Sequence, residues 1–127
     1  EMLSLPRLTD RKQLAVQNIM KQMSAAMIEL RMMDLLMARN ERLMRYTLLH
    51  GVSENSPAAL AFFASIEVLA FKQLKRGTEL ARLSQRMQEK YKYEATECGS
   101  LLWIHKAILP WAQPWRESVE PLNRSFN

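Results

Sequence analysis

The sequence is poor in the residues that interrupt helices. Its 127 residues include 3 Gly and 5 Pro, so turns must be few and the elements between them long. Val and Ile, which favour strands, are scarce, whereas Leu, Met, Ala, Glu, Gln, Arg and Lys, which have high helix propensity, dominate. The sequence therefore predicts an all-α protein.

Cysteine is almost absent as well. Cys98 stands alone, which excludes a disulfide within the chain and favours an intracellular, reducing compartment over secretion. No run of roughly 18 apolar residues occurs, so the sequence predicts no helix that spans a membrane. The first residues also lack the basic and then apolar pattern of a signal peptide.

Groups for catalysis and metal binding are few. The two histidines, His50 and His105, and Cys98 match no zinc-ligand spacing. The carboxylate–histidine motif of di-iron bundles and the glycine-rich phosphate loop are both missing. A histidine at the end of a helix suits the helix dipole, and a lone Cys is more often buried and unreactive than catalytic. We therefore expect no enzyme activity, cofactor, metal site or small-molecule substrate.

What the sequence does contain is two long amphipathic stretches. Thr9 or Asp10 can cap a helix that starts at residue 11, and Gly51 ends the first stretch. Ser56 followed by Pro57 signals the start of the second. These signals predict a helix over about 11–49, a loop over 50–56 and a helix over about 57–97.

The remaining residues predict little further regular structure. A short helix over about 100–109 ends at Pro110, and an irregular C-terminal tail follows. Gly77, inside the second long helix, indicates a kink or a close helix crossing. A loop this short makes the long helices antiparallel. The predicted fold is a single domain over 1–127, a long antiparallel helical hairpin with a short third helix.

The apolar stripes of both long helices are too wide for such a hairpin to bury. We therefore expect self-association or a protein partner to complete the bundle, which makes the chain a non-catalytic interaction module, a structural or adaptor subunit. Methionine fills irregular cores and also adapts to varied partners, so the nine Met fit either role. The residues predicted to pack against partner helices are Met23, Met27, Leu30, Met37, Phe62, Phe63 and Ile66.

The basic charge supports two alternatives. The chain carries a net charge of +5, which suits an anionic membrane or a nucleic acid. One alternative is a membrane-targeting helical bundle of the type found in toxins and effectors, bound peripherally to anionic phospholipid. Its lipid-binding tip would comprise Arg42, Arg45, Leu48, Leu49, His50 and Val52. The other is RNA binding, which is disfavoured because Glu79 and Glu89 interrupt the basic face of the second helix.

Overall fold

The computed structural model describes residues 2–92 and 97–124 of the chain. Most of these residues are helical and none forms a strand beyond one isolated bridge between Arg7 and Val52, which confirms the all-α prediction. The chain falls into two compact units, Glu1–Ser56 and Pro57–Asn127. The single domain over 1–127 stays a prediction.

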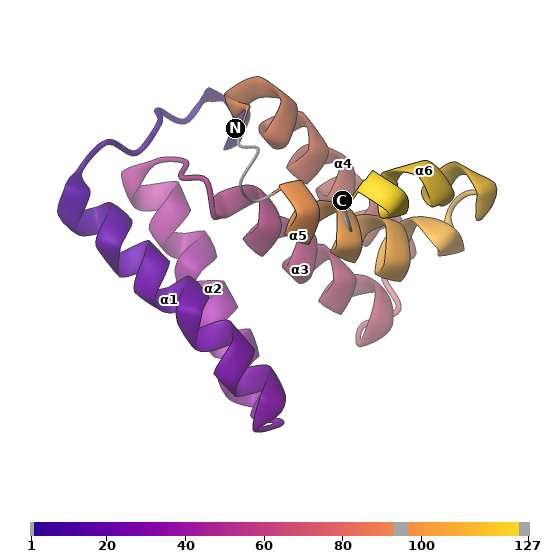
Figure 1. Cartoon of the computed structure of the whole chain (residues 1–127), viewed down its shortest axis with the longest axis horizontal. Helices are drawn as coiled ribbons and strands as arrows, with labels where there is room; N and C mark the ends of the chain where they lie inside the picture. The colour runs from indigo at the N-terminus through magenta and orange to yellow at the C-terminus, as the bar shows by residue number, and fades with distance from the viewer. Residues whose placement is uncertain (1, 93–96, 125–127) are drawn as a thin grey trace. The chain divides into compact units, whose positions relative to one another are not determined.

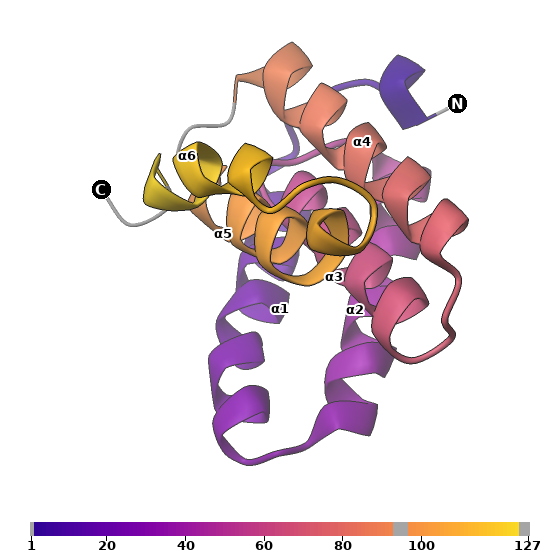
Figure 2. The ribbon, with the colours of Figure 1, turned by 90° about the vertical axis from the view of Figure 1, so that its right-hand side faces the viewer.

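The first unit is a helical hairpin. A short 3₁₀ turn at Met2–Ser4 is followed by α1 (Arg11–Glu29) and α2 (Met33–His50), which lie side by side and run in opposite directions (Figures 1 and 2). Asp10 caps α1, because its Oδ1 accepts hydrogen bonds from the backbone N–H groups of Lys12, at 2.8 Å, and Gln13, at 3.1 Å. The predicted helix start is thereby confirmed.

The single helix expected over 11–49 is interrupted at residues 30–32. Arg31 adopts a left-handed conformation with φ of 55°. The N–H of Met32 donates to the carbonyl of Met27 at 2.8 Å, and the N–H of Arg31 to that of Ile28 at 3.1 Å. This is a Schellman motif, which ends helices most often at a glycine. Since an arginine takes that position here, the sequence offered no signal for the break.

The segment after α2 pairs with the N-terminal lead-in. Val52 donates its N–H to the Pro6 carbonyl at 2.9 Å and accepts from the Leu8 N–H at 2.8 Å. Gly51, with φ of 108°, caps α2 as predicted, and a Cβ there would lie 2.5 Å from the Pro6 oxygen. Glycine is therefore required at this position for its conformation and for space.

The second unit contains four helices in its described residues. They are α3 (Ser56–Leu69), α4 (Leu74–Tyr91), α5 (Glu97–Leu102) and α6 (Arg116–Arg124). A π-helical turn over Trp103–Ile108 and a 3₁₀ turn over Leu109–Trp111 continue α5 without a break. The predicted short helix over 100–109 therefore exists, but it starts earlier and widens in its second half.

Two predictions for this unit need correction. The helix expected over 57–97 breaks at residues 70–73, where Lys72 has φ of 58° and the Gln73 N–H donates to the Glu67 carbonyl at 2.8 Å. Residues 93–96, within that range, lie outside the described residues. The tail expected to be irregular contains α6, although Pro121 lies inside it; of the same tail, residues 125–127 are not described.

The core of the second unit is apolar and closely packed. Gly77 of α4 lies against α3, because a Cβ at Gly77 would stand 2.9 Å from the Ala64 carbonyl oxygen and closer still to Val68 Cγ2. The close crossing predicted at Gly77 is confirmed. This small residue lets α3 and α4 approach each other, and both pack against the segment after α5. The cluster they form consists of Ala61, Ala64, Val68, Ala81, Ile104, Ile108 and Leu109.

Candidate functional site

The first unit exposes a line of apolar side chains along α1. Val16, Ile19, Met23 and the C-cap residue Leu30 are 38%, 63%, 46% and 69% exposed. Their separations of three, four and seven residues match one seam of a coiled coil, so the four side chains lie along one side of the helix. These four residues are called the α1 row below.

The side of α1 that the fold buries is more polar than the α1 row. Gln17 is fully buried and Gln13 and Ser24 are half-buried, beside the buried Met27 and the half-buried Leu14 and Met20. Gln17 accepts a hydrogen bond from Ser53 Oγ, but its Nε2 and the Oε1 of Gln13 have no hydrogen-bond partner among the described residues. At 3.6 residues per turn, this buried side and the α1 row are offset by roughly a quarter of a turn. The α1 row therefore lies beside the packing interface of α1 rather than within it.

Further polar contacts connect α1, α2 and the loop between α2 and α3. Thr47 Oγ1 lies 2.9 Å from Ser56 Oγ and donates to the Leu43 carbonyl at 3.0 Å. Asn55 Nδ2 donates to Asn18 Oδ1 at 2.7 Å. These bonds compensate the burial of hydroxyl and amide groups, but each contributes only about 1 kcal/mol net. The hairpin thus gains less from its interior than an apolar interface would give.

The residues predicted to contact partner helices divide into two groups. Met23, Leu30 and Met37 are exposed, and the first two belong to the α1 row. Met27 and Phe62 are buried, whereas Phe63 and Ile66 are half-buried. The Phe62 ring packs edge-on against Trp103, with ring centroids 4.8 Å apart. Phe62 is therefore part of the interior of the second unit.

The residues predicted to form a lipid-binding tip lie in the second half of α2 and directly after it. Arg42, Arg45, Leu48, Leu49 and His50 are exposed on α2, with Arg45 paired to Glu41 at 2.8 Å and His50 against the Tyr46 ring at 4.3 Å. Val52 is fully buried by its pairing with the lead-in. The turn between α1 and α2 lies at residues 30–32, and the lipid-binding role of the residues near the end of α2 stays a prediction.

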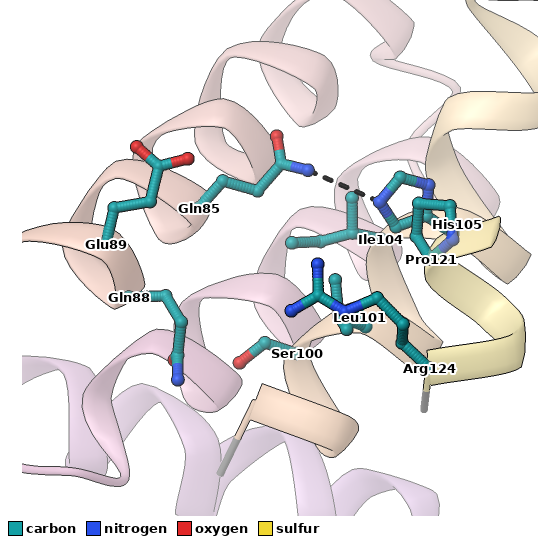
Figure 3. Close-up of a pocket in the computed structure, with 9 residues that line it drawn as sticks. All are labelled: Gln85, Gln88, Glu89, Ser100, Leu101, Ile104, His105, Pro121 and Arg124. Atoms are coloured by element: carbon teal, nitrogen blue, oxygen red, sulfur yellow. Dashed lines mark hydrogen bonds between the residues drawn. The ribbon is translucent and has the colours of Figure 1, made fainter. Parts of the chain in front are cut away.

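A cavity of about 320 Å³ lies in the second unit (Figure 3). Its wall is formed by α4, by α5 and the π-helical turn, and by α6. The lining residues are Gln85, Gln88, Glu89, Ser100, Leu101, Ile104, His105, Pro121 and Arg124. The sequence does not indicate this site, because its residues come from three separate segments and follow no known spacing.

His105 is the buried titratable group of this cavity. Its Nε2 lies 3.4 Å from Gln85 Nε2 and its Nδ1 lies 3.4 Å from Ser118 Oγ. With the glutamine amide donating to Nε2, the tautomer protonated at Nδ1 donates to the serine hydroxyl. Burial lowers the pKa of His105 below the ordinary value of 6.5, so the ring is neutral at pH 7.

Cys98 lies on the exposed side of α5, contrary to the buried position expected for it. Ser100, two residues further along the helix, occupies the buried side instead. Across residues 2–92 and 97–124, no group of three or more His, Cys, Asp or Glu side chains is placed to hold a metal ion. Within the same residues, no helix has the length and hydropathy needed to cross a membrane.

Comparisons with protein-family models, with curated proteins and with solved structures find no match to this chain.

Proposed function

We propose that this protein is a helical interaction module that binds an acidic amphipathic helix of a partner protein along the α1 row. The observation that carries the proposal is the position of Gln17, which is buried while Ile19 and Met23 are exposed. A helix stable only within its own chain would place its apolar side inward. The arrangement of α1 is the one expected when a second helix covers its apolar side.

The α1 row is large enough to support a complex. Complete burial of one large apolar side chain contributes roughly 1.5–3 kcal/mol. The four side chains of the row, together with the apolar residues of the incoming helix, must also offset the cost of association, which is at least about 4 kcal/mol. This balance favours an affinity in the micromolar range, which corresponds to about −8 kcal/mol.

Charge identifies the kind of partner. Residues 11–50 contain seven Arg and Lys and three Asp and Glu, a net charge of +4. Lys12 is exposed and lies one helical turn before Val16 on the same side of α1. A second copy of the hairpin would bring the same positive charge to the interface and be repelled. A helix with acidic residues beside its apolar seam is attracted instead.

A pair of synthetic peptides tests the proposal. Both are 21-residue helices with Leu and Ile at the two seam positions of each heptad, and they differ only in having Glu or Lys at the flanking positions. We expect the Glu peptide to bind with a Kd in the micromolar range, measured by fluorescence anisotropy, and the Lys peptide to bind at least tenfold more weakly. The Glu peptide should also lose affinity as salt is raised.

Two variants locate the binding surface. Ile19→Glu introduces a charge in the middle of the α1 row and should weaken binding of the Glu peptide at least tenfold. Leu69→Glu changes a residue of the second unit that is 48% exposed and should leave binding unchanged. Equal binding of the two peptides would contradict the charge argument, and equal affinity of the two variants would exclude the α1 row.

Vesicles containing phosphatidylserine provide the decisive comparison with the membrane hypothesis. The proposal predicts that they retain no more protein than neutral vesicles do. If anionic vesicles retain the protein, and Arg45→Glu together with Leu49→Asn abolishes that retention, the membrane-targeting function replaces the one proposed here.

A further inference from the structure

The cavity of the second unit combines donor groups with an apolar surface. Figure 3 shows the guanidinium of Arg124 directed into the cavity, toward the wall that carries Gln88 and Ser100. The amide groups of Gln85 and Gln88 supply further N–H donors. Leu101, Ile104 and Pro121 form the apolar part of the wall. At about 320 Å³ the cavity has the size of a small-molecule site.

The segment that presents His105 to this cavity is unusual. Residues Trp103–Ile108 form a π-helical turn, a conformation that is rare and occurs frequently at functional sites. Within this turn Ile104 and Ile108 are buried in the core, while His105 faces Gln85 and Ser118. The turn therefore places the imidazole between Gln85 and Ser118, each of which contacts one of its nitrogen atoms.

The charges of the wall restrict the ligand. Arg124 is positive, Glu89 is negative, and the buried His105 is neutral at pH 7. The wall therefore has no net charge, which disfavours a doubly charged anion such as phosphate. A singly charged carboxylate can still be bound, because a guanidinium has five N–H donors and can bind an anion while keeping a contact within the chain.

We propose that this cavity binds a small monocarboxylate with an apolar body. Its carboxylate accepts hydrogen bonds from Arg124, and its apolar part lies against Leu101, Ile104 and Pro121. Glu89 stands on the opposite side of the cavity from Arg124 and does not compete for the guanidinium (Figure 3). This site is independent of the α1 row, since it lies entirely within the second unit.

Benzoate and benzamide are matched probes for this proposal. They share a ring and a planar polar group, but only benzoate is charged. Titration of the full chain, followed by the NMR signals of the His105 imidazole, should give a Kd of about 1 mM or tighter for benzoate. Benzamide should bind at least tenfold more weakly, and so should inorganic phosphate. Equal affinity for benzoate and benzamide, or tighter binding of phosphate, would overturn the proposal. This test uses the unmodified protein.

Two variants assign the contact to Arg124. Arg124→Gln should reduce benzoate affinity at least tenfold, because it removes the cation of the cavity. Arg116→Gln makes the same change on an exposed residue of α6 outside the cavity and should leave the affinity unaltered. If the two variants bind benzoate equally, the carboxylate does not contact Arg124. Circular dichroism of both variants shows whether α6 is retained. If α6 is lost in a variant, the comparison between benzoate and benzamide on the unmodified protein decides the proposal.

The pKa of His105 provides an independent test of where the ligand binds. Since its pKa is lowered by burial, the ring should titrate below pH 6.5 in the free protein. A bound carboxylate places a negative charge near the ring and should raise this pKa. A pKa that stays unchanged when benzoate is bound would show that the ligand occupies another place.

Discussion

The two compact units bury polar and apolar side chains in different proportions. In Glu1–Ser56, the buried residues include Gln17, Asn40, Thr47 and Ser53 beside Leu36 and Leu43. Among the described residues, Pro57–Asn127 buries eleven hydrophobic and seven polar or charged residues, whereas Glu1–Ser56 buries five hydrophobic and six polar ones. The exposed large apolar residues follow the opposite distribution, with eleven in the described residues of the first unit and six in those of the second.

This difference has an energetic consequence. Each apolar group moved from water into a core contributes to stability, whereas a buried amide without a hydrogen-bond partner costs about 1–3 kcal/mol. The second unit uses its apolar residues for its own fold. The first unit leaves many of them in solvent, where they add nothing to the fold and remain available to a partner.

One pair of identical substitutions tests this comparison most strongly. Ile108→Ala removes a fully buried side chain of the second unit and should lower the free energy of unfolding by about 3 kcal/mol. Ile19→Ala changes a residue of the first unit that is 63% exposed, and the loss should stay within about 0.5 kcal/mol. Urea denaturation followed by circular dichroism measures both. Equal losses would mean that α1 buries its apolar row within the chain, and the contrast between the units would disappear.

The packing of the second unit can be examined with its glycines. Gly77→Ala forces a Cβ against Val68 and the Ala64 carbonyl and should cost about 2 kcal/mol, even after the gain in helix propensity. Gly99→Ala, in α5, meets nothing nearer than Ala58 Cβ at 3.9 Å and should stabilise the protein by up to about 1 kcal/mol. Thermal unfolding of the two variants should therefore shift in opposite directions. A shift in the same direction would show that α3 and α4 are not in close contact at Gly77.

The features predicted from sequence are those with a local chemical signal. The all-α fold class follows from composition, the start of α1 from Asp10, and the end of α2 from Gly51. The close crossing at Gly77 was indicated by a glycine where helix propensity is otherwise high. Each of these features depends on a residue whose backbone or side chain is suited to one role.

The features that could not be predicted have no such residue. Both breaks in the long helices use a basic residue in the left-handed conformation, Arg31 and Lys72, where the usual signal is glycine. Helical spacing identified the apolar stripe of α1 but not the direction it faces, since Gln17 is buried through a bond to the distant Ser53. The cavity around His105 likewise depends on segments far apart in the chain.

The helix breaks at Arg31 in the first unit and at Lys72 in the second allow a further comparison of the units, with the smallest expected change in stability. A side chain in the left-handed conformation costs about 1 kcal/mol or more relative to glycine. Arg31→Gly should therefore stabilise the protein by about 1 kcal/mol. Arg42→Gly, at an exposed position in the interior of α2, should destabilise it by about the same amount. Lys72→Gly should gain less than Arg31→Gly, because Lys72 Nζ donates to the Leu69 carbonyl at 2.8 Å and this bond is lost.

Differential scanning calorimetry measures the three shifts in one series. If Arg31→Gly lowers the melting temperature as Arg42→Gly does, residue 31 is helical and the first unit contains the continuous helix expected from its sequence. In that case the α1 row would extend directly into α2, and the binding surface would be one long helix. If the melting temperature instead rises with Arg31→Gly and falls with Arg42→Gly, the α1 row ends at Leu30. A partner helix of about 21 residues, roughly 32 Å long, would then suffice to cover α1.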